Sequence, residues 1–285
     1  FTRPDKEDDR VRQIEALSAQ TGPVLLAYPD SPAADDLVAQ WTTAHDPVAD
    51  VTSDGVRHTV WLIDETATIA ALSAAFEAMD NLYIADGHHR SAAASRVAAS
   101  RRGQSPDAEY FLSVIFPANQ MRIMDYNRVV RDLNGLSLAD FLTRIGEHFA
   151  ISPADGAVHP EKPGVMGMYL AGQWYRLEID PHLVPAGDPV ARLDVSLLSD
   201  HLLAPVLGIG DLRRDKRIDF IGGIRGTAEL ERRVDSGEMA VAFAMHATQM
   251  SDLMAVADSG QVMPPKSTWF EPKLADGLVS HVINR

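Results

Sequence analysis

The chain has 285 residues, of which 46% are hydrophobic and 7% aromatic, and its formal net charge is −14. This length is enough for one large hydrophobic core or for two smaller ones, and we favour two. The negative charge disfavours nonspecific binding to nucleic acid or anionic membranes, and the absence of cysteine excludes disulfides and thiolate chemistry.

The N-terminal half is expected to alternate between helices and strands. A first helix should begin near Asp8, and a hairpin turn is expected at Asp54-Gly55. Further strands are predicted at residues 23–28, 57–63, 82–85 and 110–116, and further helices at 33–43, 66–78, 91–99 and 138–149. Residues 121–130 read as an extended segment, in which Asp125 and Arg128 are interpreted as part of a salt-bridged loop.

The C-terminal half repeats this alternation after a stretch rich in Gly and Pro at residues 152–167. A hairpin is expected to turn at Ala171-Gly172. Helices are predicted at residues 194–207, 227–236 and 249–258, and strands at 219–222 and 239–245. The whole pattern predicts an α/β or mixed α+β fold with an N-terminal subdomain, residues 1–151, and a smaller C-terminal α/β subdomain, residues 152–285.

The most informative segment is Asp86-Gly87-His88-His89-Arg90, which joins a predicted strand to an alanine-rich predicted helix. Backbone N–H groups at the start of a helix have no partner within the helix and favour an anion. Histidine transfers protons near neutral pH, and the arginine fork suits a phosphate or carboxylate. We therefore predict a phosphate-handling site and prefer it to a plain polar turn in which Asp86 caps the helix.

A metal site at the same turn is a weaker interpretation. Asp86 is a candidate metal ligand, but adjacent histidines at a helix start point in different directions. No His-x-x-x-His pattern supports a metal either. We therefore assign no residue as a ligand of a metal ion that the protein holds on its own.

Two other segments carry phosphate-binding residue types. Lys266-Ser267-Thr268 places a cation beside two hydroxyls, which suits phosphate, although the P-loop glycine spacing is absent. The basic run at residues 213–217 is interpreted as solvated surface rather than as a site.

Several motifs together resemble the bacterial domain of unknown function 1015 family, over about Lys6 to Val282. They lie at residues 86–90, 125–128, 193–195, 205–208, 234–237 and 262–273. Members usually carry a further N-terminal region, compared with which this chain looks truncated. The resemblance implies that the Asp86–Arg90 turn is functional, and it leaves the reaction open.

The Gly87-to-Arg90 turn is also similar to the Gly-x-His-Arg turn of the sulfiredoxin and ParB-like nucleotide-binding fold, which includes free-serine kinases. This second resemblance implies that the turn holds nucleotide phosphates, with histidine and arginine as direct contacts. Sulfiredoxin chemistry is excluded because the chain lacks cysteine.

These observations predict a cytoplasmic, nucleotide-dependent phosphotransferase, for example a kinase of a hydroxylated metabolite such as serine, that uses ATP or ADP with Mg²⁺. The alternatives are a phosphatase, and a regulatory module that binds a nucleotide or metabolite without turnover. The expected partner is a small phosphate or nucleotide, without nucleic acid or membrane. The catalytic candidates are His88, His89 and Asp86, and the cofactor-binding candidates are Gly87, Arg90, Lys266, Ser267 and Thr268.

Overall fold

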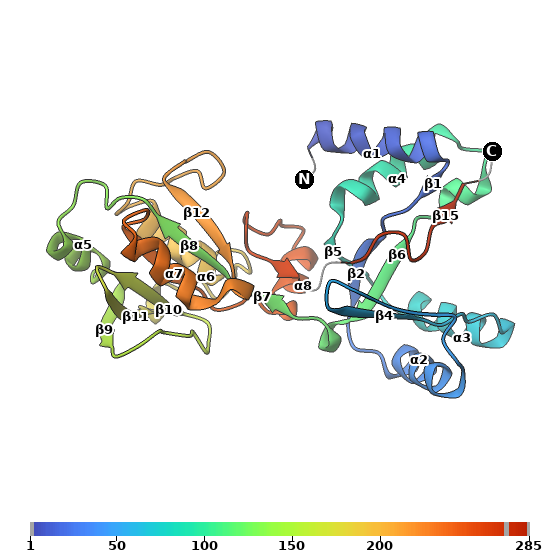
Figure 1. Ribbon diagram of the computed structural model, residues 1–285, viewed down its shortest axis with the longest axis horizontal. Helices are drawn as coiled ribbons and strands as arrows, with labels where there is room; N and C mark the ends of the chain where they lie inside the picture. The colour runs from blue at the N-terminus through green and yellow to red at the C-terminus, as the bar shows by residue number, and fades with distance from the viewer. Residues whose placement is uncertain (1–2, 271–273, 284–285) are drawn as a thin grey trace. The chain divides into compact units, whose positions relative to one another are not determined.

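The computed structural model describes residues 3–270 and 274–283 (Figure 1). Residues 271–273, at the end of the last predicted motif, lie outside the described residues. The chain forms two compact units: unit 1 contains residues 1–121 and 272–285, and unit 2 contains residues 122–271. This division differs from the expected boundary at residue 151, because strand β8 (Tyr126–Val130) pairs with two strands of unit 2.

Unit 1 contains a three-stranded sheet in the order β5-β2-β6. Its strands are β2 (Val24–Tyr28), β5 (Tyr83–Asp86) and β6 (Ser113–Pro117). The central strand β2 is buried at all five positions, runs parallel to β6 and antiparallel to β5. A strand buried on both faces reads as a continuous apolar run, which is why residues 23–28 were predictable.

The helices of unit 1 form two pairs, α1 with α4 and α2 with α3 (Figure 1). Their bounds are α1 (Pro4–Leu17), α2 (Pro32–Ala44), α3 (Thr66–Glu77) and α4 (His88–Ser100), with 3₁₀ turns η1 (Pro106–Glu109) and η2 (Ala118–Gln120). Ile14 of α1 packs with Ala93 and Val97 of α4. Small alanine side chains allow this close approach of the two helices.

Two short strand pairs complete unit 1. The predicted hairpin forms as β3 (Ala49–Ser53) and β4 (Val56–Val60), and its turn residues Asp54 and Gly55 both have positive φ. Strand β1 (Ala19–Gln20) pairs with β15 (His281–Val282) and so joins the C-terminal segment to unit 1.

Unit 2 is built on a six-stranded antiparallel sheet in the order β12-β8-β13-β10-β11-β9. Besides β8, its strands are β9 (Phe149–Ala154), β10 (Val165–Leu170), β11 (Gln173–Ile179), β12 (Ile218–Gly222) and β13 (Val241–Ala244). A separate pair joins β7 (Ile123–Met124) to β14 (Trp269–Phe270). The predicted hairpin between β10 and β11 is present, with Ala171 and Gly172 at positive φ.

Alternate residues of the sheet pack into two cores, as the period of a strand requires. Val129 belongs to one core and Val130 to the other. Helix α7 (Gly226–Asp235) contributes Leu230 and Val234 to the core around Val129. The larger core receives α5 (Leu138–Ile145), α6 (Asp194–Leu198), the π-helical turn η4 (Ser199–Leu203) and α8 (Met250–Asp258). Two 3₁₀ turns, η3 (Pro181–Leu183) and η5 (Gly223–Arg225), lie between these elements.

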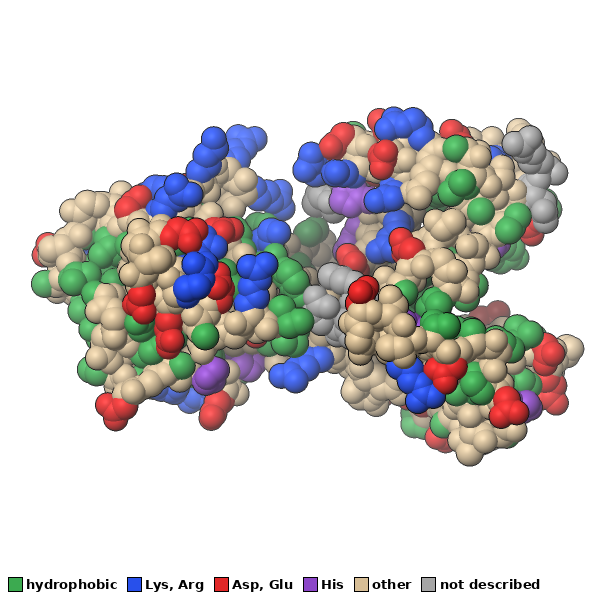
Figure 2. All heavy atoms as spheres, viewed as in Figure 1, with side chains coloured by type: hydrophobic (Ala, Val, Ile, Leu, Met, Phe, Trp, Pro, Cys, Tyr) green, Lys and Arg blue, Asp and Glu red, His purple; other side chains and the backbone are tan. Residues whose placement is uncertain are grey.

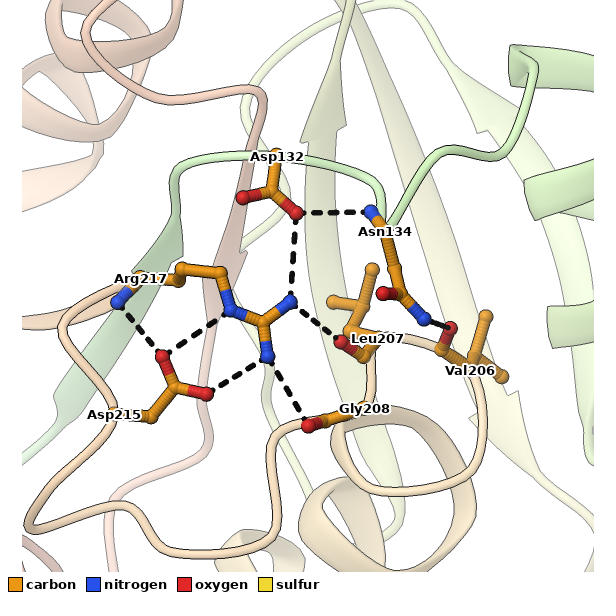
Figure 3. Close-up of polar contacts among 7 residues, drawn as sticks. All are labelled: Asp132, Asn134, Val206, Leu207, Gly208, Asp215 and Arg217. Carbon is orange, nitrogen blue, oxygen red and sulfur yellow. Dashed lines mark hydrogen bonds and ion pairs between the residues drawn. The ribbon is translucent and has the colours of Figure 1, made fainter.

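The basic run at residues 213–217 contains one arginine with a structural role (Figure 3). The Arg217 guanidinium contacts Asp215 at 2.8 Å and Asp132 at 3.5 Å. It also donates to the carbonyl oxygens of Leu207 at 3.0 Å and Gly208 at 3.1 Å. These contacts occupy the guanidinium, so Arg217 fastens the segment after η4 and is not an anion-binding candidate.

The surface carries charges of both signs. Figure 2 shows acidic and basic side chains interspersed over the face in view. Within residues 3–270 and 274–283, every helix is too short or too polar to cross a bilayer.

Asp194 is a buried carboxyl group in unit 2 whose titration predicts a pH dependence of stability. Its Oδ1 accepts a hydrogen bond from the Gly164 N–H at 2.7 Å, while its buried Oδ2 has no hydrogen-bond partner among the described residues. Burial raises the pKa of Asp194 to about 6, and the nearby carboxylate of Asp252 adds to this effect. The native state therefore binds a proton more tightly than the unfolded chain between about pH 4 and pH 6.

Because the native pKa is the higher one, the contribution of Asp194 to stability is present at low pH and is lost as the pH rises through about 6. Between about pH 4 and pH 7, this titration should lower the unfolding free energy of the native protein by about 3 kcal/mol. Asp194→Asn has no such titrating group, so we expect this decrease to be absent from its pH profile. Urea unfolding of both proteins across this range measures the difference. Parallel pH profiles for the native protein and Asp194→Asn would contradict it.

Candidate functional site

The predicted strand, turn and helix at residues 82–99 are all present in unit 1. Strand β5 ends at Asp86, Gly87 follows as the N-cap residue with φ +96°, and α4 begins at His88. No side chain of the described residues caps this helix, and its first intrahelical bond runs from the Ser91 N–H to the Gly87 carbonyl. The start of α4 thus offers N–H groups and a positive dipole end to an anion.

The Arg90 guanidinium lies close to the backbone of two glycines, where a larger side chain would meet it. A Cβ at Gly87 would lie 3.1 Å from Arg90 Nε and 3.3 Å from the Val24 Cα, and one at Gly22 would lie 3.4 Å from Arg90 Nη1. Gly87 is also required by its positive φ. Arg90 Nη2 lies 3.6 Å from Asp86 Oδ2, so the guanidinium is confined between two backbone segments and one carboxylate.

The turn lines a cavity of about 530 Å³ within unit 1, a volume in the range of small-molecule sites. One wall is the turn itself, from Asp86 to Arg90. The other walls come from α1, from residues 19–24 and from the C-terminal segment, and they include Arg10, Gln13, Thr21, Gly22 and Asp276. All five predicted residues of the turn therefore line one cavity.

The sequence pattern missed the contributions of Arg10, Gln13 and Asp276 to this cavity. Arg10 Nη1 donates to Gln13 Oε1 at 2.7 Å on the exposed face of α1. Nothing in their local sequence distinguishes these residues from ordinary surface residues. Long-range contacts bring them to the cavity, among them the packing of α1 on α4 and the pairing of β1 with β15.

The two histidines of the turn have different environments. His89 Nε2 accepts a hydrogen bond from the Arg3 N–H at 3.1 Å, so this nitrogen is engaged by the start of α1. His88 is exposed at the first position of α4. Desolvation by neighbouring groups lowers the pKa of His88, against the opposing effect of the Asp86 carboxylate. A lowered pKa favours the neutral imidazole at pH 7, which is the form that accepts a proton.

Lys266, Ser267 and Thr268 lie in unit 2, between α8 and β14. Ser267 is buried, and its hydroxyl donates to the Pro264 carbonyl at 2.7 Å. Lys266 is exposed with φ +59°, and its Nζ donates to Tyr126 Oη at 3.2 Å. A phosphate-binding role for these residues stays a prediction.

The interpretation of Asp125 and Arg128 as a salt-bridged loop is wrong. Arg128 lies within β8 and is fully buried, and no carboxylate of the described residues lies within ion-pair distance of its guanidinium. Its Nη1 donates to the Tyr126 carbonyl and its Nη2 to the Lys266 carbonyl at 3.0 Å, while its Nε has no described partner. Burial lowers the pKa of Arg128 to about 9. The guanidinium thereby fixes the backbone of Lys266 against β8.

Asp125 takes part in a different network at the end of the same strand. Asn127 Nδ2 donates to Asp125 Oδ2 at 2.6 Å, and Asn127 Oδ1 accepts from the Met245 N–H at 2.9 Å. The Gly223 N–H donates to the Asp125 carbonyl at 2.8 Å. The Asn127 side chain therefore joins β8 to the residue that follows β13, and the Asp125 backbone carbonyl joins this segment to η5, so the segment is not a surface loop.

The part of the chain that the structure describes contains no group of three or more His, Asp and Glu side chains arranged to hold a metal ion. Asp86 is a single, half-exposed carboxylate at the cavity. One or two carboxylates are enough for Mg²⁺ only when substrate phosphates supply further ligands. Asp86 thus offers a single carboxylate to such an ion.

Comparisons with solved structures return proteins of low similarity. A free serine kinase in complex with AMP is 13% identical with a TM-score of 0.45, covering 95% of this chain and 81% of that chain. SbnI from Staphylococcus aureus is 11% identical with a TM-score of 0.46, covering 97% and 80%. A conserved hypothetical protein from Pyrococcus furiosus is 13% identical with a TM-score of 0.44, covering 97% and 87%. Similarity at this level carries no argument about activity.

No curated protein matches the sequence. The family model described as "Protein of unknown function (DUF1015)" matches residues 1–196, which include the whole of the Asp86–Arg90 turn. The match confirms the family expected from the sequence motifs. The chain belongs to the DUF1015 family.

Proposed function

We propose that the protein is a nucleotide-dependent phosphotransferase that binds nucleotide phosphates at the Asp86–Arg90 turn. The observation that carries this proposal is the convergence of three features in one cavity: the uncapped start of α4, the confined Arg90 guanidinium and the exposed His88. The helix start and the guanidinium stabilise negative charge on a phosphoryl group. Because the chain as a whole is acidic, a phosphate ligand needs such a local positive site.

His88 is the better proposed proton acceptor of the two histidines. The Nε2 of His89 is already engaged by the Arg3 N–H, whereas His88 is exposed to the solvent. In the proposed reaction, the hydroxyl oxygen of a small metabolite such as serine attacks the γ-phosphorus of ATP. The bond from that phosphorus to the β–γ bridging oxygen breaks, ADP leaves, and the hydroxyl proton passes to His88.

The nucleotide is expected to bring Mg²⁺, with Asp86 as a candidate ligand from the protein. The ion would neutralise phosphate charge as the transfer proceeds. The carboxylate of Asp86 also lies 3.6 Å from the Arg90 guanidinium, which keeps that guanidinium at the turn.

A thermal-shift series with ATP, ADP and pyrophosphate, each with and without Mg²⁺, tests binding, and phosphorus NMR of ATP with serine tests transfer. We expect ATP to stabilise the protein and His88→Ala to keep this stabilisation while lowering the transfer rate by about 10²- to 10⁴-fold. His58→Ala, in β4 and outside the cavity, is the matched control.

The outcomes separate the competing functions. The proposal fails if no phosphate compound raises the melting temperature of the native protein. Stabilisation without any product would indicate a binding module, and release of inorganic phosphate without an acceptor would indicate a phosphatase.

A further inference from the structure

Asp276 is a carboxylate on the wall of the unit 1 cavity, contributed by the C-terminal segment. A Cβ at Gly22 would lie 3.1 Å from Asp276 Oδ1 and 3.4 Å from Arg90 Nη1. The carboxylate and the guanidinium therefore both lie next to the backbone of Gly22. The neighbouring backbone is fixed, because the Gly277 N–H donates to the Thr21 carbonyl.

The Asp276 side chain makes no hydrogen bond or ion pair with another described residue. Arg90, in contrast, is already paired with Asp86. An ionised carboxylate only accepts hydrogen bonds, so a ligand group that meets Asp276 must donate them.

The signs of the two charges restrict that group further. A phosphate would be repelled by Asp276, and an ammonium group beside Asp276 would lose part of its attraction to the carboxylate through repulsion by the Arg90 guanidinium. A neutral donor such as a hydroxyl is repelled by neither. In a nucleotide, the hydroxyl groups nearest to the phosphates are those of the ribose, and a carboxylate is a common partner for them.

We infer that Asp276 binds the ribose hydroxyls of the nucleotide and so selects ribonucleotides over simpler phosphates, an inference that rests on the proposed function. Arg90 and the start of α4 hold the phosphates, and Asp276 accepts from the sugar across Gly22. Asp276, Gly22 and Arg90 all line the same cavity of about 530 Å³ in unit 1, in which the sugar and the phosphates would lie.

Isothermal titration calorimetry with ADP, 2′,3′-dideoxy-ADP and pyrophosphate tests this inference. The native protein is expected to bind ADP at least about tenfold more tightly than dideoxy-ADP. This is the affinity difference that one hydrogen bond to a charged group usually contributes. Asp276→Ala should lower the ADP affinity about tenfold, abolish the preference for ADP and leave pyrophosphate binding unchanged. Asp276→Asn keeps an acceptor oxygen and should retain part of the preference.

Asp46→Ala, an exposed acid of unit 1 outside the cavity, is the matched control and should bind all three ligands like the native protein. The melting temperature of each ligand-free variant checks that it folds. The inference is overturned if Asp276→Ala weakens both nucleotides equally, or weakens pyrophosphate as much as ADP. It is also overturned if Asp276→Ala weakens serine binding and leaves the preference for ADP intact, which would assign Asp276 to an amino group.

Failure of the proposed function has a different signature. If the native protein binds none of the three ligands, the phosphate site itself is wrong. If it binds all three with equal affinity, the phosphate site stands and only the role of Asp276 is refuted.

Discussion

Arg90→Ala is expected to weaken ADP binding by about 10- to 100-fold while the protein stays folded. The guanidinium is held between Gly22 and Gly87, so its donors are oriented before a phosphate arrives. Its removal takes away charge-assisted hydrogen bonds at the start of α4. The pair with Asp86, whose side chain is 49% exposed, contributes little to stability, about 0.5 kcal/mol or less.

Calorimetric titration with ADP measures this loss, and unfolding in urea measures the stability of the same variants. Arg102→Ala removes an exposed arginine from the turn after α4 and serves as the matched control for net charge. Arg90→Lys keeps the charge without the planar fork and is expected to fall between the two. An ADP affinity for Arg90→Ala equal to that of Arg102→Ala would refute the role of Arg90.

Gly223→Ala is expected to destabilise unit 2 by about 3 kcal/mol. A Cβ at this position would lie 1.9 Å from Asp125 Oδ1 and 2.4 Å from Asp125 Cγ, so the carboxylate would have to move. That movement would break the 2.6 Å hydrogen bond from Asn127, a buried residue whose other amide atom fixes the Met245 N–H. The cost therefore combines overpacking with a disturbed buried hydrogen-bond network.

If the contact with Asp125 causes this destabilisation, then a second substitution at Asp125 should relieve it. Asp125→Ala removes the atoms that an alanine at residue 223 would meet, so the double variant should be less destabilised than the two single effects combined. Urea unfolding of the native protein, both single variants and the double variant gives the coupling free energy. Additive changes in unfolding free energy would show that the Asp125 side chain does not cause the destabilisation by Gly223→Ala.

The local parts of the fold could be predicted because their causes are local. The turns at Asp54-Gly55 and Ala171-Gly172 follow from the demand of tight hairpins for positive φ. The apolar strand β2 and the alanine-rich helix α4 carry their own periodicity and composition. The division into units was not predictable in this way, because it depends on β8 pairing with strands about a hundred residues later in the chain.

The candidate site could be predicted only in part for the same reason. The Asp86–Arg90 turn is a continuous segment, and its residue types state their chemistry directly. The burial of Arg128 could not be predicted from the sequence, because neighbouring residues do not indicate that a charged side chain is buried and charged residues are seldom fully buried. Asp276 lies far along the chain from the turn, and its segment joins unit 1 through long-range contacts such as the pairing of β1 with β15 and the packing of Ile283 with α1 and α4.

Unit 1 is formed by two segments that are separated in the chain by unit 2, and this affects the order in which its cavity is completed during synthesis. Residues 3–121 are synthesised before unit 2, whereas the segment that carries Asp276 and Ile283 follows unit 2 in the chain. Domains generally fold during synthesis from the N-terminal end, so unit 2 can mature while unit 1 still lacks one edge of its cavity. The cavity of unit 1 therefore receives its last wall only after unit 2 has been synthesised.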